Sequence, residues 1–162
     1  RGHSGRKQGA PELMKSVSTL SGNEVESQAF SMTQELSIHV KFETNLEPFS
    51  PVLGIVIKSN RGQPILGLNN RFAGTGPFPT RVSSGIVACD LGAVPLVPGT
   101  YRVDIYLGDE YRDFDVVTDA IEFSILPSDY YGTGKLAPAG TGSLRWNAEW
   151  KLLDGEPSEK ER

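Results

Sequence analysis

Three side chains with complementary chemistry recur at every second position after a Pro-Gly turn. They are Arg102, Asp104 and Tyr106, and residues two apart in a β-strand point to the same face. A guanidinium donates hydrogen bonds, a carboxylate accepts them, and a phenol ring offers an apolar face to C–H groups. Such a face can bind sugars or another protein, and it does not resemble a catalytic centre. Outward positions of any strand are polar too, so a merely solvated face stays an alternative.

A second polar group ends a nearby predicted strand, residues 65–70. It consists of Asn69, Asn70 and Arg71, whose amide and guanidinium groups can also bridge sugar hydroxyls. We therefore expect these three side chains to lie at one end of the row described above. The six residues together form the predicted carbohydrate-binding site.

The sequence contains no pattern of an enzyme active site. Two histidines and one cysteine are too few for a zinc cluster, and the chain lacks Gly-x-Ser-x-Gly. Residues 132–135, Gly-Thr-Gly-Lys, resemble part of a phosphate-binding loop, but Asp129 and Leu136 stand where Gly and Ser or Thr are required. His39 is expected on the polar face of its strand, which with Lys41 is the alternative binding face. We expect no catalytic residue, metal or cofactor in this chain.

Length and composition indicate one domain with its own core. The chain has 162 residues and a formal net charge of -4, without the basic stripe of a nucleic-acid-binding protein. The single cysteine, Cys89, excludes an internal disulfide and lies in an apolar stretch, so we expect a small core residue. The sequence contains no apolar run of 18 residues, the length needed to cross a membrane.

The polar groups are expected to lie on β-strands, because apolar and polar residues alternate in three separate segments. Alternation at 36–42, 103–107 and 121–125, with frequent Gly and Pro between segments, predicts an all-β, immunoglobulin-like sandwich of two antiparallel sheets. Tyr101, directly after the Pro-Gly turn, is placed like the corner tyrosine of such a sandwich. The predicted core consists of Leu36, Ile38, Val40, Phe42, Val103, Ile105, Leu107, Ile121, Phe123 and Ile125.

The ends of the chain differ from the middle. Residues 1–11 are expected to be a flexible lead-in, 12–153 the sandwich, and 154–162 a charged, disordered tail. Residues 144–152 alternate Leu and Trp with polar residues after a connection of about 16 residues, which is long for a compact domain. We expect this last strand to be exchanged in a homodimer, with Trp146 and Trp150 as interface anchors.

Several motifs in order resemble one family. They are Arg1-Gly2-His3-Ser4-Gly5, Pro51 to Ile57 with Gly62 and Gly67-x-Asn69, Leu96-x-Pro98-Gly99-x-Tyr101-x-Val103, Asp115-x-Val117-x-Asp119-Ala120-x-x-Phe123, Asp129 to Gly134, and the closing Trp. The set resembles the C-terminal domain of Wzt-type ATPase subunits of O-antigen polysaccharide ABC transporters. Each motif is weak alone, and together they cover most of the chain.

The resemblance implies a non-catalytic, carbohydrate-binding sandwich. It would bind the modified non-reducing end of an O-antigen-type glycan in lipopolysaccharide biosynthesis and couple binding to polysaccharide export. It would be a homodimer with an exchanged C-terminal strand, cytoplasmic and peripheral at the inner membrane through the membrane-spanning transporter subunit. ATP and Mg²⁺ would be bound only by an upstream domain. A ligand-free protein–protein interaction sandwich and a carbohydrate-binding module of a secreted glycosidase are the alternatives, which the sequence upstream of Arg1 would help to separate.

Overall fold

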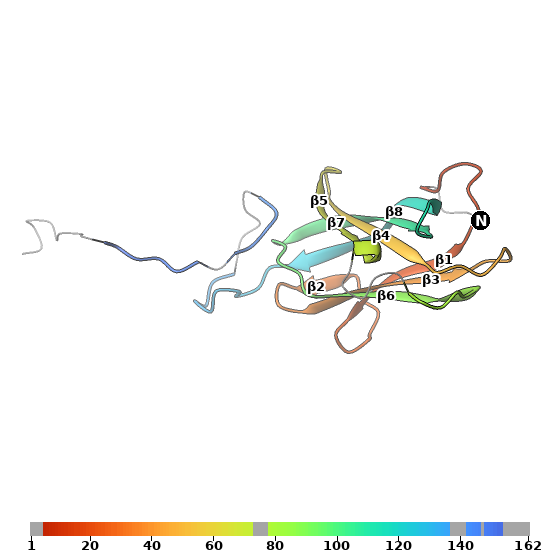
Figure 1. The fold of residues 1–162 in the computed structure, drawn as a ribbon. Coiled ribbons are helices and arrows are strands. Elements are labelled where there is room, and N and C mark those ends of the chain that lie inside the picture. Colours follow the sequence, from red (N-terminus) through yellow and green to blue (C-terminus); the bar gives the residue numbers. More distant parts are fainter. Residues whose placement is uncertain (1–4, 73–77, 137–141, 147, 154–162) are drawn as a thin grey trace, which may run out of the picture.

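Two β-sheets pack face to face in the computed structural model, which describes residues 5–72, 78–136, 142–146 and 148–153 (Figure 1). The first sheet has the order β1-β3-β6, and the second has the order β2-β8-β7-β4-β5. The strands are β1 (Met14–Ser21), β2 (Ala29–Ser31), β3 (Glu35–Glu43), β4 (Val52–Ser59), β5 (Pro64–Asn69), β6 (Ser84–Ala93), β7 (Gly99–Gly108) and β8 (Asp113–Leu126). Their pairing is antiparallel except for the short β2, which runs parallel to β8. The predicted all-β sandwich is confirmed.

The predicted core is largely confirmed, because one face of each alternating strand lies between the sheets. Nine of the ten predicted residues are buried, and Ile121 is half-buried at the margin of the core. The ring of Phe123 stacks on Tyr101 with centroids 5.6 Å apart. The Tyr101 hydroxyl donates to the Val97 carbonyl at 2.5 Å, which is the corner contact expected from its place after the turn. Burial raises the pKa of Tyr101.

The N-terminal segment is attached to the sandwich from residue 5 onward. Arg6 forms a β-bridge with Val117, and the Thr118 N–H donates to the Gly5 carbonyl at 3.0 Å. The Arg6 guanidinium also pairs with Asp115, with Nε 2.8 Å from Oδ1. Residues 5–7 therefore differ from the flexible lead-in that was expected, because a buried carboxylate more than 100 positions away holds them. Residues 1–4 lie outside the described part.

The C-terminal segment forms no extended ladder with the rest of this chain in the part described. Leu144 bridges Leu96, and Arg145 is buried, donating to the carbonyls of Met32 and Val94. Beyond this point the segment extends away from the sandwich (Figure 1), and its two tryptophans are exposed, Trp146 by 81% and Trp150 by 92%. Among the described residues of 144–152, the pairing with the rest of this chain is thus limited to this bridge, and the exchange with a partner stays a prediction. Residues 154–162 lie outside the described part.

The described helical structure is a single 3-10 turn, η1 (Asn70–Phe72). Accordingly, the described residues include no helix with the length and apolarity needed to span a membrane.

Candidate functional site

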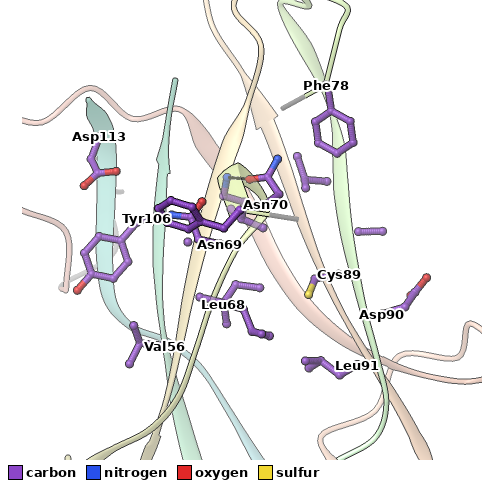
Figure 2. Close-up of a pocket in the computed structure, with 17 residues that line it drawn as sticks. Val56, Leu68, Asn69, Asn70, Phe78, Cys89, Asp90, Leu91, Tyr106 and Asp113 are labelled. Atoms are coloured by element: carbon purple, nitrogen blue, oxygen red, sulfur yellow. Dashed lines mark hydrogen bonds between the residues drawn. The ribbon is translucent and has the colours of Figure 1, made fainter. Parts of the chain in front are cut away.

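A large cleft opens along one edge of the sandwich, where β5 and β6 are the end strands of their sheets. Its volume is about 950 Å³, near the upper end of the usual range for ligand cavities. Figure 2 shows Tyr106, Asn69 and Val56 on one side of it and Cys89, Asp90 and Leu91 on the other. The cleft thus joins the space between the edge strands to the outer face of the five-stranded sheet.

The outer part of the cleft has a hollow built over a glycine. Gly54 of β4 lies opposite both Asn69 of β5 and Tyr106 of β7. A Cβ on Gly54 would lie 3.3 Å from the Tyr106 Cβ and 3.7 Å from the Asn69 Nδ2, so glycine lets these two side chains lie close to the β4 backbone. In the next row, Val56 lies between Gly67 of β5 and Asp104 of β7, and of these three only Val56 and Gly67 line the cleft. An aromatic ring and an amide therefore flank an apolar floor.

The two asparagines have different roles. Asn70 is occupied by the end of β4: its Oδ1 accepts from the Leu53 N–H at 2.6 Å, and its Nδ2 donates to the Pro51 carbonyl at 3.2 Å. Asn69 accepts from the Arg71 N–H through Oδ1 at 2.8 Å. Its Nδ2, like the Tyr106 hydroxyl, has no hydrogen-bond partner among the described residues, so both groups can serve a ligand.

Arg71 lies beside the cleft and connects two segments that border it. Its guanidinium donates to the Asp109 carbonyl at 3.2 Å, which ties η1 to the loop between β7 and β8. Arg71 does not line the cleft. It therefore contributes to the position of Asn69 and Asn70 rather than to the cleft surface.

Arg102 and Asp104 belong to an ion-pair network farther along the same sheet face. The Lys58 Nζ lies 2.8 Å from Asp104 Oδ1 and 2.8 Å from Asp119 Oδ1. Arg102 pairs with Asp119 at 3.3 Å and donates to the Asn60 carbonyl at 2.7 Å. Burial opposes the charge of Lys58, but its hydrogen bonds to both carboxylates outweigh burial and raise its pKa.

Asp104 is buried because it supports an irregularity in β8. Its Oδ1 accepts from the Asp119 N–H at 2.8 Å, where the register shifts between Val103 and Ile105 and Asp119 has a φ of 51°. The carboxylate satisfies a backbone group that the ladder leaves unpaired. Of the six predicted residues, the structure thus brings Tyr106, Asn69 and Asn70 to one cleft, and places Arg102, Asp104 and Arg71 outside it.

Several residues that line the cleft were missed by sequence reasoning. Phe72 is 83% exposed and Phe78 is 43% exposed, so both present aromatic surface to the cleft. Glycine inside a strand marks a place where another group can approach the backbone. Gly54, within an otherwise apolar strand, was therefore a usable signal. Phe72 and Phe78 carried no such signal, because they flank a Gly- and Pro-rich loop.

Cys89 is half-buried and lines the cleft. Burial and, to a lesser extent, the charge of Asp90 raise the pKa of its thiol. A protonated thiol is a poor nucleophile, which agrees with the expected packing role. His39, on the alternative face, is half-buried beside a separate cavity of about 290 Å³.

Backbone amides of the glycine-rich segment near residue 132 are hydrogen-bonded to a carboxylate of the same segment. Asp129 accepts from the Thr133 N–H at 3.0 Å and from the Gly134 N–H at 2.8 Å. These amides would otherwise point at an anion, so the structure gives no support to a phosphate-binding loop here. Within the described residues, no group of three or more His, Cys, Asp or Glu side chains could hold a metal ion.

Comparison with known proteins identifies the family of this domain. The family model of the Wzt C-terminal domain matches residues 13–136. The chain belongs to the Wzt C-terminal domain family. A crystal structure of the C-terminal domain of Wzt has 18% sequence identity and a TM-score of 0.66, covering 94% of this chain and 87% of that one. This likeness shows that the Wzt C-terminal domain fold is shared.

Other comparisons add little. A CARDB domain from Pyrococcus furiosus has 12% identity and a TM-score of 0.37, covering 72% of this chain and 96% of that one. A score this low carries no argument. No curated protein matches the chain.

Proposed function

We propose that this Wzt C-terminal domain binds carbohydrate at the Gly54 hollow and has no catalytic activity of its own. The ligand would be the modified non-reducing end of an O-antigen-type polysaccharide, held for export by an ABC transporter. One observation carries the proposal: within the cleft, Tyr106 and Asn69 flank Gly54 on its two sides, and each has a hydrogen-bonding group without a partner among the described residues. Family membership supports the same function.

The geometry suits one sugar ring. Residues two apart along a strand are separated by about 7 Å, close to the width of a pyranose. The C–H face of the sugar would rest on the apolar floor and against Tyr106, while the Asn69 amide and the Tyr106 hydroxyl would bind its hydroxyl groups. Phe72 and Phe78 would contact neighbouring sugars. Because each such hydrogen bond yields only about 1 kcal/mol net, binding should be weak.

The test is a glycan array of bacterial oligosaccharides probed with the wild-type domain and with Tyr106→Ala. We expect the wild type to bind a subset of glycans and the variant to lose at least about tenfold in affinity, the loss of roughly 1.4 kcal/mol of contacts. Tyr111→Ala is the matched control, because Tyr111 is 88% exposed on the β7–β8 loop and does not line the cleft. An array without any bound glycan, or a Tyr106→Ala variant that binds like wild type, would contradict the proposal.

The parent protein would supply the rest of the export function. We propose an upstream ATPase domain that binds ATP and Mg²⁺, and a membrane-spanning subunit that places this domain at the inner membrane. The C-terminal segment would be exchanged in a homodimer. Support for the exchange comes from the exposed apolar side chains of this segment, Leu144, Trp146, Trp150 and Leu152.

Removing both tryptophans of this segment should dissociate the dimer. In the Trp146→Ser/Trp150→Ser variant the apolar anchors are lost, so light scattering after size exclusion should change from dimer to monomer mass. Tyr111→Ser, an equally exposed aromatic residue elsewhere, should remain dimeric. A wild-type domain that is monomeric at all concentrations tested, or a double variant that is still a dimer, would refute the exchange.

A further inference from the structure

Arg145 is a buried cation without an acidic partner in the part of the chain that the structure describes. Only 7% of the residue is exposed, and none of the ion pairs among the described residues includes it. Its Nη2 donates instead to the carbonyls of Met32 and Val94, and its guanidinium lies 4.2 Å from the centre of the Tyr130 ring, within the range of a cation–π contact. Because a charge leaves water only when other groups compensate it, these three contacts hold the guanidinium at one place.

Arg145 connects both sheets to the C-terminal segment. Met32 directly follows β2 of the five-stranded sheet, and Val94 directly follows β6 of the three-stranded sheet. The neighbouring bridge between Leu96 and Leu144 is closed by two backbone hydrogen bonds of 2.9 Å each. The segment is therefore fixed to its own sandwich up to residue 145.

The fixed part ends directly before the first tryptophan. Trp146 is 81% exposed and follows Arg145 without an intervening residue. Because one residue of extended chain spans at most about 3.6 Å, the Trp146 backbone stays at this end of the sandwich while Arg145 is in place. Any second copy that buries Trp146 must therefore approach this end of the sandwich.

Further apolar side chains are exposed at this end. We call them the C-terminal end surface, and they are Leu126 (48%), Tyr131 (51%) and Leu144 (62%). Leu126 pairs with Ser31 at the end of β2, one position before a carbonyl that binds Arg145. The Tyr131 ring packs edge to face on Tyr130 with centroids 4.9 Å apart, and Leu144 directly precedes Arg145. Exposed apolar groups that gather around one point are typical of an interaction surface.

From the fixed exit of the segment and the exposed groups around it, we infer that a second copy covers the C-terminal end surface, and that Arg145 positions the exchanged segment there. The inference rests on the proposed exchange. A closed two-fold dimer uses the same surface on both partners, so the end surface of one copy meets the end surface of the other. Holding the segment in one direction before association reduces the entropy lost on binding. The end surface shares no residue with the lining of the cleft, so dimerisation and carbohydrate binding use different residues.

The surface is tested with the variant Leu126→Ser/Tyr131→Ser, in which the segment and both tryptophans are intact. We expect its dimer dissociation constant, measured by sedimentation equilibrium over a dilution series, to rise at least about tenfold. Its melting temperature should change little, because both side chains are about half exposed. Leu46→Ser/Tyr111→Ser is the matched control, since it replaces the same two residue types at exposed positions of other loops, and it should dimerise like the wild type.

The outcomes separate this inference from the proposed exchange. A folded Leu126→Ser/Tyr131→Ser variant that dimerises like the wild type, or a control that weakens the dimer equally, would overturn the inference and leave the exchange standing. A wild-type domain that is monomeric throughout the dilution series would overturn the exchange and this inference with it.

The positioning role of Arg145 is tested with two substitutions of similar length. Arg145→Met removes the hydrogen bonds to both carbonyls, so its dimer dissociation constant should rise about tenfold while the far-UV circular dichroism spectrum keeps its β-sheet form. Arg145→Lys keeps a cation that can donate to the same carbonyls, and its dissociation constant should rise only about threefold. An Arg145→Met variant that dimerises like the wild type, or an Arg145→Lys variant that recovers none of the loss, would overturn the positioning role.

Discussion

Replacing Asp115 by alanine should lower the free energy of unfolding by about 3–5 kcal/mol, the usual cost of removing one partner from a buried ion pair. The carboxylate is fully buried and accepts hydrogen bonds from Arg6 at 2.8 and 3.1 Å, from the Leu13 N–H at 3.0 Å and from the Met14 N–H at 2.9 Å. Its loss leaves two backbone donors without an acceptor, and the Arg6 guanidinium keeps only its bonds to Glu12 and to the Met14 carbonyl. Urea unfolding monitored by far-UV circular dichroism would measure the change in the free energy of unfolding, because this signal reports the β-strands and not the exposed tryptophans.

Asp113→Asn is the control for that prediction. Asp113 lies two residues earlier in the same strand but is exposed, so the substitution should change stability by less than about 0.5 kcal/mol. Arg6→Ala should fall between the two, because the backbone donors keep their acceptor. An Asp115→Ala variant as stable as Asp113→Asn would mean that the N-terminal segment contributes nothing to folding.

Gly54→Val should abolish detectable glycan binding, a loss of at least about tenfold, while the sandwich stays folded. The added side chain would fill the hollow between Tyr106 and Asn69, where even a Cβ comes within 3.3 Å of Tyr106. Valine suits a β-strand, and Gly54 does not have the left-handed backbone conformation that requires glycine. Calorimetric titration with the glycan found on the array would measure the loss.

Gly85→Ala is the matched control. Gly85 is also a strand glycine, and a Cβ there makes ordinary contact, 3.5 Å, with the Phe42 ring. Gly85 lies outside the cleft, so the glycan should bind as it does to wild type. If Gly54→Val binds normally while remaining folded, the hollow is not the binding site, and the face with His39 becomes the next candidate.

The fold was predictable from sequence because burial in a sheet follows a local period of two. Leu36, Ile38 and Val40 needed no knowledge of their partners to be placed in the core. The binding site was less predictable from sequence. Arg102, Asp104 and Tyr106 lie at every second position, so the alternation alone does not tell which of them line the cleft. The ion-pair partners of the first two, Lys58 and Asp119, are found only when register and the irregularity in β8 are known.

A long-range pair also explains the difference at the N-terminal end. Arg6 lies in a polar, glycine-rich segment that reads as flexible, and its buried acceptor Asp115 is distant in sequence. In contrast, the exchange predicted for residues 144–152 stays a prediction, because within the described part of one chain only Leu144 and Arg145 contact the sandwich. Sequence periodicity indicates which side chains need a partner and does not identify that partner.

The hydrogen bond from Arg71 to the Asp109 carbonyl has a kinetic consequence. It joins the two loops beside the cleft, so the walls are already in place before a sugar arrives and little ordering entropy is lost on binding. With a weak Kd of about 1 mM and an ordinary association rate of about 10⁶ M⁻¹s⁻¹, a bound sugar would leave in roughly a millisecond. Under the proposed function, a preformed site of this kind would therefore exchange bound chain ends within milliseconds and would not retain a chain during export.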